Sequence, residues 1–181
     1  PLIALWMETL EVSFQQIGIV SGASALGIIC SAYFAPHLAQ KYGYVVTINI
    51  GLIIAAIMTV LFRYTENYAA WLAIRFIGGL GLGLHWVLTE AWLSNIVSDH
   101  GRTRVMAIYA TAISVGFAAG PGIIWFFGFA TPTPFYLIAA FLLIAALPIY
   151  TLRGHEPNAE FSSGGSPLLL IRRAPTVASA C

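Results

Sequence analysis

Charged residues are scarce in this sequence. Only 8% of its 181 residues are charged and 59% are apolar, whereas about 25% of the residues in an ordinary soluble domain are charged. A soluble fold could not cover so much apolar surface with polar side chains. The net charge is +1, and no basic stripe with interleaved aromatic residues is present, so we expect no nucleic acid partner. The composition predicts a membrane protein.

Cysteine and catalytic motifs are also lacking. The two cysteines are Cys30, inside an apolar stretch, and Cys181, at the last position. No metal-ligand spacing joins them, so we predict neither a disulfide nor a metal site. The sequence contains no Gly-x-Ser-x-Gly, no phosphate loop and no His-Glu-x-x-His, which are motifs of hydrolytic and phosphate chemistry. We expect a protein that is not an enzyme and that uses no cofactor.

Five apolar stretches are long enough to cross a lipid bilayer, for which about 20 residues suffice. They are residues 17–36, 45–62, 69–92, 105–129 and 135–152. Residues 1–6, PLIALW, are too short to span a bilayer, and we interpret them as the end of a membrane helix whose beginning is missing. The sequence therefore predicts an all-α, polytopic membrane protein with five full transmembrane helices and a partial first helix.

Proline and glycine mark the expected ends and bends of these helices. We expect Pro36 to end the first full span and residues 37–44 to form a polar turn. A second group of helix-perturbing residues lies in the span 105–129, at Gly116, Gly120, Pro121 and Gly122. Because proline bends membrane helices and small residues allow close approach, we predict a kinked and tightly packed helix there.

The end of the sequence differs in composition from the spans. Residues 154–166, GHEPNAEFSSGGS, have the Gly, Ser and Pro content of a flexible linker. Residues 167–181 are apolar again, with one basic pair. We therefore predict a transmembrane bundle at residues 1–153, a linker at 154–166 and the start of a further segment at 167–181.

Lysine and arginine predict the orientation, because they concentrate in cytoplasmic loops. The turns on one side carry six basic residues, whereas those on the other side carry Arg63 alone. The six are Lys41, Arg102, Arg104, Arg153, Arg172 and Arg173. We predict that these turns and the linker at 154–166 are cytoplasmic, and that Glu8, Glu11 and Glu66 lie outside.

The span at residues 69–92 contains ionisable side chains. A charge at membrane depth is costly, so such residues usually face a protein interior or a water-filled path. At about 100° per residue, one stripe of this helix contains Arg75, Gly79, Trp86 and Glu90. We predict that this stripe lines a path for substrate or protons, and we include His85, which lies on a neighbouring face.

Simpler interpretations of these side chains stay open. Arg75 could extend its side chain to the outer interface, since it lies about 9 Å inside the span. Glu90 is close to the cytoplasmic end and could be an ordinary interfacial carboxylate. His85 shares its face with Gly78, Gly81 and Trp92, and we interpret it first as a packing histidine, with contact to substrate or protons as the alternative.

Three short motifs resemble those of the major facilitator superfamily of transporters. The turn PHLAQKYGY resembles the family's inter-helix signature, which it matches at Leu38, Ala39, Lys41 and Gly43 and from which it departs at Pro36, Gln40 and Tyr44. Gln40 replaces the family's acidic residue. Arg75 followed by Gly79, Gly81 and Gly83 is similar to the fourth-helix pattern. Gly116, Gly120 and Pro121 resemble the fifth-helix antiporter pattern, although Ile124 and Trp125 stand where that pattern has a Gly pair.

The resemblance implies the N-terminal half of a carrier of about twelve helices, with residues 167–181 as the start of helix seven. It implies a secondary active transporter of a small solute that works by alternating access between two halves. The expected partners are a small-molecule substrate, protons as the coupling ion, the lipid bilayer and the missing C-terminal half. Efflux is preferred because of the partial antiporter pattern. The expected location is the plasma or inner membrane.

The resemblance also implies a cytoplasmic gating motif, which comprises Leu38, Ala39, Gln40, Lys41, Gly43, Arg102 and Arg104. The two arginines could instead act only as charges that orient the chain in the membrane. A rival function class is a non-transporting membrane sensor or scaffold, and Gln40 favours it. The charges within the span at 69–92 favour transport.

Overall fold

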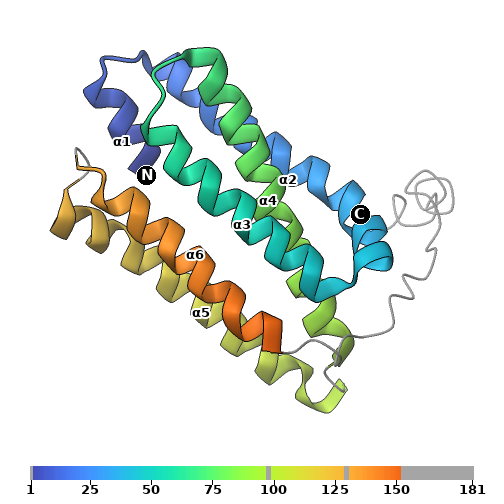
Figure 1. Cartoon of the computed structure of the whole chain (residues 1–181). Helices are drawn as coiled ribbons and strands as arrows, with labels where there is room; N and C mark the ends of the chain where they lie inside the picture. Colours follow the sequence, from blue (N-terminus) through green and yellow to red (C-terminus); the bar gives the residue numbers. More distant parts are fainter. Residues whose placement is uncertain (1, 97–98, 129–130, 152–181) are drawn as a thin grey trace, which may run out of the picture.

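The computed structural model describes residues 2–96, 99–128 and 131–151, except for the side chains of residues 96, 99, 100 and 102 (Figure 1). The described residues form six α-helices and no strand. The helices are α1 (Leu2–Thr9), α2 (Phe14–Tyr42), α3 (Tyr44–Arg63), α4 (Tyr68–Ile96), α5 (Asp99–Phe127) and α6 (Thr133–Thr151). Helices α2 to α6 are each long and apolar enough to cross a membrane. The all-α class and the five full spans are confirmed.

The predicted end of the first full span at Pro36 is wrong. Helix α2 continues through Pro36 to Tyr42, and only Gly43 connects it to α3. Gly43 has φ 86°, a conformation that suits glycine, and its N–H donates to the Ala39 carbonyl at 2.9 Å. The polar residues of this segment are exposed on the last turns of the helix. The hydropathy of the sequence therefore falls several residues before α2 ends, which is why the end of this helix was predicted too early.

Helix α4 lies at the centre of the most closely packed part of the bundle. It packs extensively against both α2 and α3, and α3 also packs along α6 (Figure 1). A β-carbon added at Gly83 would lie 2.9 Å from the Ile28 Cα, and one added at Gly81 would lie 3.1 Å from the Ala55 backbone nitrogen. The backbones of α2, α3 and α4 thus approach closely, as small residues allow in membrane helices.

Apolar side chains form two buried clusters, one towards each end of the bundle. The cluster at the end that carries α1 contains Leu2, Trp6, Met7, Ile17, Val20, Phe62, Trp71, Ile74 and Phe135. The cluster at the end that carries Gly43 contains Ala35, Ala39, Tyr44, Val45, Ile48, Leu52, Leu84, Leu88 and Trp92. We call these two ends the α1 end and the Gly43 end.

Helix α1 is short, and aromatic contacts hold it against the bundle. The Arg63 guanidinium carbon lies 3.9 Å from the centroid of the Trp6 ring. The Phe135 ring meets the same Trp6 ring edge-on, with centroids 6.3 Å apart. Trp6 therefore joins α1 to α3 and α6.

Helix α5 is the least packed of the spanning helices. It continues through Pro121 to Phe127. β-Carbons added at Gly116, Gly120 or Gly122 would have no described atom within 4 Å. The predicted tight packing of this segment is therefore wrong for the described residues, because no other described helix backbone comes close to these glycines.

The turns alternate between the two ends of the bundle, as the sequence predicts. Which end faces the cytoplasm stays a prediction. His37 is exposed near the Gly43 end and Glu66 is exposed at the α1 end. In a background without other cysteines, we expect Glu66→Cys to react with an impermeant maleimide added to intact cells, and His37→Cys to react only after permeabilisation. Labelling of His37→Cys from outside intact cells would contradict the predicted orientation.

Candidate functional site

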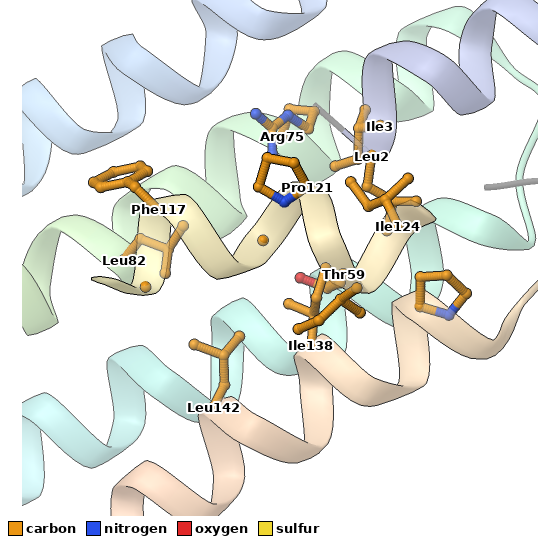
Figure 2. Close-up of a pocket in the computed structure, with 14 residues that line it drawn as sticks. Leu2, Ile3, Thr59, Arg75, Leu82, Phe117, Pro121, Ile124, Ile138 and Leu142 are labelled. Carbon is orange, nitrogen blue, oxygen red and sulfur yellow. The ribbon is translucent and has the colours of Figure 1, made fainter. Parts of the chain in front are cut away.

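A cavity of about 370 Å³ opens between five of the helices (Figure 2). Its walls come from α1, α3, α4, α5 and α6. The lining residues are Leu2, Ile3, Thr59, Arg75, Leu82, Gly116, Phe117, Gly120, Pro121, Ile123, Ile124, Pro134, Ile138 and Leu142. The wall is thus apolar apart from one charged and one hydroxyl side chain. Its volume is at the lower end of the range of about 300–1,000 Å³ that is typical of small-molecule sites.

Arg75 is the charged group of this cavity. It lies seven residues into α4, which is about 10 Å along the helix from Tyr68. Its Nε is buried and has no hydrogen-bond partner among the described residues. Buried donors are normally paired, and the described residues offer this Nε no acceptor.

Thr59 is the other polar side chain of the lining, and Pro121 leaves one backbone carbonyl of α5 without its helical donor. The Thr59 hydroxyl donates to the Ala55 carbonyl at 2.7 Å, so its proton is already used and its oxygen can only accept. Pro121 has no N–H, so the Phe117 carbonyl one turn earlier lacks its helical donor. The described lining therefore offers the Arg75 guanidinium as its donor, together with a few acceptors.

The stripe predicted on α4 does not form one surface. Gly79 is buried against α2, where an added β-carbon would lie 3.0 Å from the Ser24 Cα. Trp86 and Glu90 are exposed and hydrogen-bonded to each other, with 2.8 Å between the Trp86 Nε1 and the Glu90 Oε1. Of the four residues, Arg75 alone lines the cavity.

His85 lies away from the cavity lining. It is partly buried, and its Nδ1 is 3.3 Å from the Thr89 hydroxyl, one turn along the same helix. This contact fits a hydrogen-bonded packing histidine. A role of His85 towards substrate or protons stays a prediction.

The predicted gating residues lie at the Gly43 end, and none of them lines the cavity. Ala39 is buried in the Gly43-end cluster and Leu38 packs against that cluster. Gln40, Lys41 and Arg104 are exposed, and the Lys41 Nζ lies 5.1 Å from the centroid of the Tyr42 ring. The side chain of Arg102 and the predicted linker at 154–166 lie outside the described residues.

Most of the cavity residues were not predicted. Leu82 lies two helical turns from Arg75, so helical spacing could have identified it. Gly116, Gly120 and Pro121 were predicted as a packed kink, whereas the structure places them in the cavity wall. In the sequence, the apolar cavity residues of α5 and α6 cannot be distinguished from residues that face lipid. Only the packing of the helices shows that they line the cavity.

The comparisons with known proteins agree with this architecture. The sequence model of the Major Facilitator Superfamily matches residues 1–181. The quinolone resistance protein NorA of Staphylococcus aureus is 26% identical over 165 residues, which cover 91% of this chain and 42% of NorA. The MFS-type transporter YcaD of Salmonella arizonae is 24% identical over 182 aligned positions, which cover 99% of this chain and 48% of YcaD.

The chain thus spans about half the length of these curated relatives. The family match covers the whole sequence, and the described part of the chain contains five helices able to span a membrane. This chain therefore belongs to the Major Facilitator Superfamily and is part of a multi-pass integral membrane protein.

Proposed function

We propose that this chain forms most of one half of a secondary active transporter that moves a small organic solute across the membrane by alternating access. The observation that carries the proposal is Arg75, a charged side chain seven residues into the apolar helix α4, in a chain that the Major Facilitator Superfamily model matches throughout. A charged group at membrane depth is costly and usually marks a substrate or ion path.

The distribution of packing supports alternating access. Helices α2, α3 and α4 approach backbone to backbone, whereas α5 makes few contacts with the other described helices. A closely packed unit of this kind can move as a rigid body, which is how many secondary transporters expose a site to each side in turn. We propose that the α2–α3–α4 unit moves in this way.

We further propose that the direction is efflux and that protons drive it. The relative NorA is named a quinolone resistance protein, and a name of that kind fits export of a toxic solute. The partial antiporter pattern at Gly116, Gly120 and Pro121 points the same way. Proton coupling requires an ionisable group on the path. His85 and Glu90 of α4 are the candidates that the sequence offers, although neither lines the cavity described above.

Flux measurements test this function. We expect the complete protein, with any sequence that flanks residues 1–181, to support saturable efflux of at least one solute from a panel of labelled organic acids, bases and neutral compounds in proteoliposomes. An imposed proton gradient should drive the flux and a protonophore should abolish it. Absence of flux for the whole panel, from protein shown to be folded and inserted, would favour the non-transporting sensor or scaffold.

A further inference from the structure

Tyr44 connects the turn between α2 and α3 to the end of α4. Resting on the proposed transport function, we infer that Tyr44, Trp92 and Asn95 form a clasp that makes the turn at Gly43 move together with α4 during transport. We call these three residues the Tyr44 clasp. Tyr44 is then a positioning residue, because it acts through the turn and not on the solute.

The side chain of Tyr44 makes two different contacts with the last turns of α4. Tyr44 is the first residue of α3, and only 1% of its surface is exposed. Its hydroxyl is hydrogen-bonded to the Asn95 side chain. Its ring lies beside the buried ring of Trp92, with 6.1 Å between the two centroids. Both contacts are made within this chain, so they do not require any further part of the complete protein.

The turn before Tyr44 is short and its backbone groups are paired. Gly43 alone connects α2 to α3, and its N–H donates to the Ala39 carbonyl at 2.9 Å. The Gly43 carbonyl accepts from the Thr47 N–H at 3.2 Å and from the Thr47 hydroxyl at 2.8 Å. Paired backbone groups on both sides of Gly43 make the connection stiff. A displacement of Tyr44 therefore moves the whole turn.

The turn carries two of the predicted gating residues. Gln40 and Lys41 are exposed in the last turn of α2, within four residues of Tyr44. The contacts of Tyr44 therefore link the position of both residues to α4. Tyr44 is also one of the residues at which this turn departs from the family's inter-helix signature. The inference thus comes from the contacts in this chain and not from the family resemblance.

Hydrogen exchange of the turn tests the clasp. Tyr44→Phe keeps the ring beside Trp92 and removes the hydroxyl, whereas Asn95→Ala removes the partner of that hydroxyl. In the complete protein in phosphatidylcholine nanodiscs, we expect each change to speed amide exchange of the peptide that contains Gly43 and Thr47. The expected factor is about threefold to tenfold, which is the effect of one lost hydrogen bond. The double variant should exchange no faster than either single variant, because both changes remove the same contact.

Tyr42→Phe is the matched control. Tyr42 lies two residues before Tyr44 and is 50% exposed, so loss of its hydroxyl should leave exchange of the turn unchanged. Wild-type exchange in Tyr44→Phe would overturn the clasp. So would effects of Tyr44→Phe and Asn95→Ala that multiply in the double variant, or an equal effect of Tyr42→Phe.

Solute flux tests the positioning role. At equal abundance of folded protein, Tyr44→Phe and Asn95→Ala should each lower the maximal flux by about threefold to tenfold. The KM of the transported solute should stay within about twofold of wild type, because a contact at the helix ends does not bind the solute. The thermal unfolding midpoint should fall by no more than about 4 °C. Wild-type flux in both variants, or a loss of flux that appears only as a higher KM, would overturn the positioning role.

The two measurements separate this inference from the proposed function. If the wild-type protein is folded and transports no solute, but the exchange effects of Tyr44→Phe and Asn95→Ala are coupled, the clasp stands and the proposed transport is contradicted. If the wild-type protein transports and exchange of the turn is unchanged in both variants, the clasp is wrong and the proposed transport stands.

Discussion

Gly27→Val is expected to prevent stable folding, whereas Gly22→Val on the same helix is expected to be tolerated. A β-carbon at residue 27 would lie 2.9 Å from the Leu80 backbone nitrogen and closer still to the Phe76 carbonyl oxygen. Both atoms belong to the backbone of α4, which cannot rotate away as a side chain can. Overpacking of a close-packed interior costs about 1–3 kcal/mol when side chains can adjust, so we expect at least the upper end of that range here.

Gly22 provides a matched control. A β-carbon at this residue would have no described atom within 4 Å, and the same β-branched side chain would be introduced five residues earlier in α2. The measurement is the thermal unfolding midpoint of the purified complete protein. It is taken from the fraction that stays monodisperse on size-exclusion chromatography after heating to each temperature. Equal midpoints for the two variants would contradict the backbone-to-backbone contact of α2 with α4.

Arg75→Lys is expected to reduce transport by about tenfold or more. If Arg75 holds an acidic group, of the substrate or of another helix, lysine would lose bidentate contact worth roughly 1.5–3 kcal/mol. Lysine keeps the charge but replaces the planar fork with a single ammonium group. An arginine that only extended its side chain to the membrane interface would accept lysine with little change.

The measurement is the initial rate of solute flux at equal protein abundance in the membrane. Arg63→Lys is a useful control, because Arg63 lies over the Trp6 ring and a lysine can also place a cation there. We expect the control to transport at close to the wild-type rate. Wild-type kinetics for Arg75→Lys would show that the guanidinium geometry plays no part in transport.

Sequence patterns predicted the number and approximate position of the spans, because apolar length alone sets what can cross a bilayer. They failed at the ends of helices. Pro36 and the polar residues after it indicated a turn, yet α2 continues to Tyr42. Hydropathy reports where side chains leave the lipid, whereas helix ends depend on backbone conformation, here the positive φ of Gly43.

The candidate site could be predicted only in part. Arg75 stood out because a charge in an apolar span is rare. Gly79 was grouped with it because the two residues are about 40° apart around the helix, but that angle is enough to turn Gly79 towards Ser24 of α2. Phe117 and Ile138 carry no signal of their own, since apolar residues in membrane helices face lipid, protein or cavity alike. Their role depends on contacts that no local pattern contains.

The backbone contact between α2 and α4 has a consequence for how this sequence can evolve. Gly27 faces the α4 backbone, while Gly79 and Gly83 face Ser24 and Ser31 of α2. Every other genetically encoded residue is bulkier than glycine, so no single replacement at these glycines fits without moving a helix. We expect them to change through paired or stepwise substitutions on both helices. In an alignment of many homologous sequences, substitutions at these positions of α2 and α4 should therefore covary. Their substitution rate should be lower than that of the α5 residues that line the cavity.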